Sequence, residues 1–230
     1  QFALRFSYLH QQKDNWIDNL APGAQRNNVL GGHQESAARA QLLYRNKADS
    51  DELTILFNYH WRDLAASPIA FRANIITPGS NQLIAGFDAN KVAQDGALRA
   101  MQDVISKGGS ITVENIRGAH TLTSITAYEN TEVLSRADID GGFGDLFAED
   151  LPSGPGPILF TAESADGIPH HRQFSQELRW SSNKDHSNWH YQLGAFYFDE
   201  DLNITSVSYD SIRNGRQNGS ALQNQKTTAW

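Results

Sequence analysis

Apolar and polar residues alternate over several long stretches of this sequence, and this pattern constrains the fold more than any other feature. In the clearest stretch, every second residue is apolar: Leu53, Ile55, Phe57, Tyr59 and Trp61. Because successive side chains of a β-strand point to opposite faces, such a stretch predicts a strand with one apolar and one polar face. The pattern predicts seven strands, at 2–10, 36–46, 52–62, 110–117, 120–132, 172–182 and 188–200, and the start of an eighth at 225–230.

One segment has a different period. In residues 89–107 the apolar positions fall on one stripe of a helix: Val92, Leu98, Met101, Val104 and Ile105. This spacing predicts one short helix, carried on a connection between two strands.

The connections between the predicted strands alternate between short and long. The short ones are 46–51, 117–119 and 183–187, and the long segments are 11–35, 63–109, 133–171 and 201–226. Loops longer than about 12–15 residues are uncommon in compact soluble domains. A barrel whose strands run up and down through an outer membrane has short turns on one side and long extracellular loops on the other. The rhythm therefore favours an all-β, antiparallel, up-and-down segment of a transmembrane β-barrel.

The composition excludes several other classes of protein. The chain has 230 residues, no cysteine and a net charge of −7, so we expect no disulfide scaffold, no thiolate metal site and no nucleic-acid partner. No stretch approaches the roughly 18 consecutive apolar residues of a membrane-spanning helix. The mean hydropathy of −0.52 is still compatible with a barrel, in which every second residue is polar.

Aromatic residues are predicted to gather at the two ends of the strands. Those that flank the short turns are Tyr44, Trp180 and Trp189, and those that lead into long loops are Tyr8, Trp61, Tyr128 and Tyr197. Aromatic girdles at both membrane–water interfaces are typical of outer-membrane barrels.

The sequence resembles the TonB-dependent outer-membrane receptors. The likeness is carried by the strand-like segments 4–8, 39–44, 121–128, 174–180 and 191–200, together with 16–19, in this order and spacing. It implies a ligand-gated transporter of the cell outer membrane, with a barrel of about 22 strands, an N-terminal plug and energy supplied by the TonB complex. The nutrient would be scarce, with an iron–siderophore complex as the first expectation.

The chain departs from this family in three respects. No plug precedes the first predicted strand, no TonB box is visible, and the C-terminal residues 225–230 do not alternate like a closing strand. We therefore expect residues 1–230 to be a partial barrel domain of seven to eight strands. Its expected partners are the TonB complex, through the missing N-terminal part, outer-membrane lipid, and a small-molecule or oligosaccharide ligand; no cofactor is expected.

Two groups of candidate site residues follow from these predictions. The long loops carry aromatic, histidine and arginine side chains that are suited to ligand binding: Trp16, Arg72, Phe143, Phe147, His170 and His171. The charged residues predicted to face the lumen of the barrel are Arg5, Arg39, Glu177 and Arg179.

Metal binding and catalysis are not expected. No Asp or Glu stands at a spacing that would complete a metal site with His170 and His171. The acidic segment 138–145 is similar to a calcium loop but has glycine at the wrong positions, so a flexible glycine-rich loop is the favoured interpretation. No nucleophile elbow, HExxH motif or P-loop is present, and we expect no enzymatic activity.

Two other interpretations remain open on the sequence alone. One is a soluble carbohydrate-binding β-sandwich, in which Phe57, Tyr59, Tyr191 and Leu193 would pack into a closed core. The other is a small self-contained eight-stranded outer-membrane barrel with a structural or adhesive role.

Overall fold

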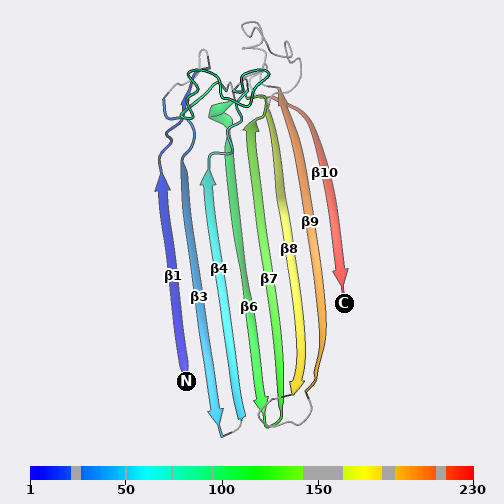
Figure 1. Ribbon diagram of the computed structural model, residues 1–230. Helices are drawn as coiled ribbons and strands as arrows, with labels where there is room; N and C mark the ends of the chain where they lie inside the picture. Colours follow the sequence, from blue (N-terminus) through cyan, green and yellow to red (C-terminus); the bar gives the residue numbers. More distant parts are fainter. Residues whose placement is uncertain are drawn as a thin grey trace.

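The computed structural model of the protein is dominated by one antiparallel sheet (Figure 1). The structure describes residues 1–21, 27–49, 51–73, 75–94, 96–141, 163–182, 190–210 and 216–230. The eight strands of the sheet are neighbours in chain order: β1 (Phe2–Lys13), β3 (His33–Ala48), β4 (Asp51–Ala66), β6 (Met101–Arg117), β7 (His120–Asp138), β8 (Glu163–Ser182), β9 (Gln192–Asp210) and β10 (Arg216–Ala229). The predicted all-β, antiparallel, up-and-down architecture is confirmed.

The short turns that join β3 to β4, β6 to β7 and β8 to β9, as predicted, lie at one end of the sheet, and the long connections of β1 to β3, β4 to β6 and β7 to β8 lie at the other (Figure 1). β9 ends and β10 begins at this second end as well, although only residues 211–215 separate them. The predicted long segment 201–226 is wrong, because β9 continues to Asp210 and β10 begins at Arg216. We call the two ends of the sheet the loop end and the turn end.

Most strands extend further toward the loop end than the sequence predicts. For example, β6 begins at Met101 rather than 110, and β8 begins at Glu163 rather than 172. In these extensions polar residues lie on both faces, as in Ser164 and Asp166 on one face and Arg136 on the other. A strand with water on both sides has no apolar face, so period-two alternation does not reveal it.

The predicted helix at 89–107 is wrong. Lys91–Val92 form the short strand β5, Ala97–Arg99 form a single turn of 3-10 helix (η1), and β6 begins at Met101. The backbone of β6 pairs with β4 on one side and β7 on the other along nearly its whole length. This tertiary pairing, together with the β-branched Val104 and Ile105, outweighs the helical spacing of the apolar residues.

The sheet has two open edges. Within the described residues, β1 pairs with β3 alone and β10 pairs with β9 alone. β1 runs toward the loop end and β10 runs away from it (Figure 1).

A small folded unit covers the loop end of β1, β3, β4 and β6. We call it the loop cap and define it as the described residues of 14–32 and 67–100. The short strands β2 (Asp18–Asn19) and β5 pair in parallel and join its two segments. The cap holds the main apolar core of the described chain, formed by Ile17, Val29, Leu30, Val92 and Ala97.

Candidate functional site: a two-faced sheet with a basic recess

The register of the sheet separates an apolar face from a polar face. Leu4 lies opposite Leu42, which lies opposite Phe57, which in turn lies opposite Ile111. The next row on the other face contains Arg5, Gln41, Asn58 and Ser110. The alternation predicted within single strands is therefore aligned from strand to strand, because directly opposed residues share a face.

The apolar face is not covered by another layer of the described chain. Phe57 is 42% exposed and Leu193 is 61% exposed, and Phe6 and Ile111 are also exposed. These residues lie on four different strands, so the exposed apolar surface extends across the sheet. Monomeric soluble proteins rarely expose apolar patches larger than a few hundred Å². Of the residues expected in the closed core of a β-sandwich, Phe57, Tyr59 and Leu193 are exposed within the described chain.

Two rows of aromatic side chains border the apolar face. Toward the loop end these are Tyr8, Trp61, Tyr128, Phe174 and Tyr197, and toward the turn end they are Tyr44, Trp180 and Tyr191. The rings of Trp180 and Tyr191 meet edge-on, with their centroids 5.4 Å apart. Trp189 lies outside the described residues. The aromatic residues toward the loop end were expected at strand ends. They lie inside the strands, which continue beyond them toward the loop end.

The two aromatic rows are parallel to each other and oblique to the strands. If directly opposed residues are followed from strand to strand, Tyr8 of β1 leads to Asp201 of β9. The aromatic residue of β9 is Tyr197, which lies four residues nearer the turn end than Asp201. The lower row descends by the same four residues between Tyr44 and Tyr191. Four residues span about 13 Å and five or six strand spacings span about 24–29 Å. The strands are therefore inclined by roughly 25–30° to the normal of the band.

The height of the apolar band follows from the same geometry. On β4 it runs from Leu53 to Trp61, or about 27 Å along the strand at 3.4 Å per residue. Corrected for the incline, the band is roughly 24 Å tall. The apolar band of transmembrane barrels is about 25 Å tall, and their strands tilt by about 35–45°. The height agrees with that of such barrels, and the incline is somewhat shallower.

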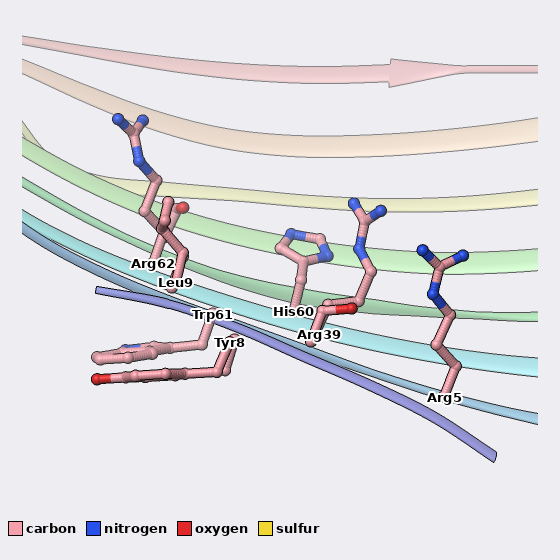
Figure 2. Close-up of a pocket in the computed structure, with 11 residues that line it drawn as sticks. Arg5, Tyr8, Leu9, Arg39, His60, Trp61 and Arg62 are labelled. Carbon is pink, nitrogen blue, oxygen red and sulfur yellow. The ribbon is translucent and has the colours of Figure 1, made fainter. Parts of the chain in front are cut away.

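The polar face of β1, β3 and β4 carries a cluster of basic side chains. Arg5, Arg39, His60 and Arg62 all project to one side of the sheet, whereas Tyr8 and Trp61 project to the other (Figure 2). They border a recess of about 420 Å³. Of the predicted lumen-facing residues, Arg5 and Arg39 belong to this cluster. Glu177 and Arg179 also lie on the polar face but on β8, where they pair with each other.

A contact between a histidine and a glutamate crosses the polar face above a glycine of β6. The Nε2 atom of His60 on β4 lies 3.0 Å from a carboxylate oxygen of Glu129 on β7. Gly108 lies between them in the same row, and a Cβ at this position would collide with the Glu129 carboxylate. The glycine thus leaves the space through which the two side chains meet. Sequence alternation placed His60 on this face but gave no indication of its partner, 69 residues away.

Arg72 is used to hold the loop cap together. Its guanidinium group donates hydrogen bonds to the carbonyl oxygens of Ala70, Ala89 and Lys91, at 3.3, 2.7 and 3.1 Å. Nearby, the Asp88 carboxylate accepts a hydrogen bond from the backbone of Asn90 and pairs with Lys91. These contacts hold the pKa of Asp88 below its usual range.

Trp16 is fixed on the outside of the loop cap. Its indole Nε1 donates a 3.0 Å hydrogen bond to the carbonyl of Gly31, and the Lys13 ammonium group lies 4.8 Å from the ring centroid. Gly31 has a φ of +92° and a Cβ there would collide with the indole, so glycine is required beside the ring. Trp16 is 40% exposed and offers one face for stacking.

A buried carboxylate anchors the loop cap to the sheet. Glu163, at the start of β8, is 1% exposed and forms ion pairs with Arg99 of η1 and with Arg136 of β7, the latter at 2.8 Å. The Arg136 guanidinium also stacks 3.6 Å from the ring centroid of Tyr209 on β9. The sequence analysis missed this anchor, because its members are separated by at least 27 residues and follow no motif.

Among the predicted loop residues, those that the structure describes are not brought together into one site. Trp16 and Arg72 lie in the loop cap, and Phe143 and Phe147 lie outside the described residues. His170 and His171, expected in a long loop, are part of β8. The Nε2 atom of His171 lies 2.8 Å from Glu200 of β9, so this histidine faces a carboxylate within the sheet. The acidic segment 138–145 is described only as far as Gly141.

The described residues contain no group of three or more His, Cys, Asp or Glu side chains that could hold a metal ion. No helix among them is long and apolar enough to cross a membrane.

Comparison of the chain with family models, with curated proteins and with solved structures found no match.

Proposed function

We propose that this chain forms part of the wall of an outer-membrane transporter that takes up a scarce nutrient. The apolar face would contact lipid, the polar face would line the lumen, and the long connections would lie outside the cell. The supporting observation is the aligned apolar band, which is roughly 24 Å tall on β4 and is exposed along its whole width. One aromatic row lies at its loop end, and the other passes two residues inside its turn end, at the level of Ile55. A lipid environment would cover this surface without a second protein layer.

The transport part of the proposal rests on the polar face and on the resemblance of the sequence. Polar and charged side chains suit a wall in contact with water and solute. The resemblance adds TonB-supplied energy and favours an iron–siderophore complex as the nutrient. Capture would fall to the loop cap, where Trp16 offers an exposed ring on a fixed backbone.

Uptake in the host tests this proposal. Deleting the gene is expected to lower the uptake of radiolabelled ferric siderophores under iron limitation, and reintroducing it is expected to restore uptake. Removal of TonB should abolish the same uptake, since the energy would come from that complex. A deletion that leaves uptake unchanged for every siderophore supplied would contradict the iron–siderophore assignment.

The self-contained eight-stranded barrel is the second candidate, and one observation favours it. The two edge strands, β1 and β10, run in opposite directions and would pair antiparallel if they met. A closed barrel resists SDS until it is heated, so the purified chain would migrate differently before and after boiling. Such a shift, combined with insertion into vesicles by the chain alone, would favour the small barrel over the transporter wall.

A further inference from the structure

Three arginines of the polar face form a diagonal line across neighbouring strands. On the neighbouring strand β3, Arg39 lies two residues nearer the loop end than Gln41, which is the residue directly opposite Arg5 of β1. On the next strand, β4, Arg62 lies two residues nearer the loop end than His60, which is the residue directly opposite Arg39. Diagonal neighbours of this kind have Cα atoms about 7–8 Å apart, within reach of long side chains. The three side chains project to the same side of the sheet (Figure 2).

Two of these arginines are not neutralised by the protein. Within the described residues, neither Arg5 nor Arg39 has a carboxylate within ion-pair distance. Five other arginines of the strands are paired with carboxylates: Arg45 with Glu52, Arg62 with Glu35, Arg136 with Glu163, Arg172 with Asp201 and Arg179 with Glu177. Arg117, at the end of β6, and Arg216, at the start of β10, form no ion pair within the described residues, but they lie at strand ends and not beside another arginine of the recess. Two adjacent cations without counter-charges repel each other, and an anion between them would relieve that repulsion.

The surroundings of the two arginines leave room for a small ligand. The recess of about 420 Å³ is bordered by short side chains between the long ones, with Ser7 and Ala37 beside the arginines and Ser106 directly opposite Arg62. Ser7 lies directly opposite Arg39 and its hydroxyl can donate a hydrogen bond. The volume is within the 300–1,000 Å³ of small-molecule pockets.

We infer that Arg5 and Arg39 form a binding site for a small molecule that carries several oxyanion groups, either carboxylates or phosphates. Each guanidinium group can donate two parallel hydrogen bonds to one such group. Arg62 is neutralised by Glu35 at 2.6 Å and is not free to move to the ligand, so the site consists of Arg5 and Arg39. This site would make polyanionic small molecules the substrate class of the proposed uptake function. It rests on that function in one respect, that the polar face of the sheet is in contact with water.

Isothermal titration of the full chain in neutral detergent tests the site, with citrate as the carboxylate probe and pyrophosphate as the phosphate probe. We expect at least one probe to bind, and binding should weaken as the salt concentration rises. Arg5→Gln and Arg39→Gln should each lower the affinity about tenfold or more, as the loss of one charge-assisted contact predicts. The probe that binds more tightly identifies the chemical class.

Arg45→Gln is the matched control. Arg45 lies on the same face of the same strand as Arg39, but it is already paired with Glu52, so its replacement should leave the affinity unchanged. Absence of binding by both probes, or equal losses in Arg39→Gln and Arg45→Gln, overturns the site. If the protein as purified from its host membrane binds neither anion, this inference alone is overturned. If it binds an anion through Arg5 and Arg39 but is recovered outside the lipid fraction, the proposed membrane function is overturned instead.

Discussion

Replacing Ile111 by arginine is expected to lower the stability of the lipid-inserted protein by about 2–4 kcal/mol. Ile111 lies on β6 in the middle of the apolar band, between Phe57 and Thr126, and its side chain is exposed. If this face contacts acyl chains, a guanidinium group there must be placed near the bilayer midplane, where it carries that cost. The free energy of unfolding measured by denaturant titration in lipid vesicles gives the value directly.

The next residue of the same strand provides the control. Thr112 lies on the polar face, between Leu56 and Ile125, so Thr112→Arg would point its charge away from lipid. It should change the free energy of unfolding by much less than Ile111→Arg. Equal costs for the two variants would mean that the faces do not differ in solvent, contrary to the proposed placement.

Replacing Glu163 by glutamine is expected to detach the loop cap from the sheet, at a cost of about 3–5 kcal/mol. The carboxylate is buried and is shared by Arg99 and Arg136. Removing one member of a buried charge cluster leaves the remaining charges without their partner in a poorly solvated site. Hydrogen exchange at the backbone amides of 91–100 measures this local opening.

Glu177→Gln is the comparison for this variant. Glu177 also pairs with an arginine, Arg179, but both side chains are partly exposed on the open polar face, where water and salt screen such pairs and their contribution to stability is small. The exchange rates at 91–100 should therefore stay at the wild-type level in Glu177→Gln. Equally small effects of the two substitutions would show that the Glu163 cluster does not anchor the cap.

The sequence predicted the sheet well where one face of each strand is apolar. Over 53–61 the alternation identified both the strand and the direction of its side chains, because successive side chains point to opposite faces and only one of these faces is apolar. It failed in the extensions toward the loop end, such as 101–109 and 163–171. There both faces are polar or crowded by the loop cap, and no alternation marks the strand.

The candidate site was predictable only in part. Alternation placed Arg5 and Arg39 on the polar face, but the strand register that sets them side by side depends on pairing with distant segments. The cluster of Glu163 with Arg99 and Arg136 depends on contacts between three separate elements and has no local pattern. The loop aromatics and histidines were chosen by residue type alone, and the fold does not gather Trp16, Arg72 and His171 into one site.

The central claim is that one face of the sheet contacts lipid and the other contacts water. The chain has no cysteine, so single cysteines placed at positions 53–60 and labelled with nitroxide probes report each site separately. The collision rates of the probes with oxygen, which is enriched in lipid, and with a water-soluble nickel chelate should alternate with a period of two. We predict high oxygen collision rates at Leu53, Ile55, Phe57 and Tyr59, and high nickel collision rates at Thr54, Leu56, Asn58 and His60. High nickel collision rates at all eight positions would contradict contact of one face with lipid.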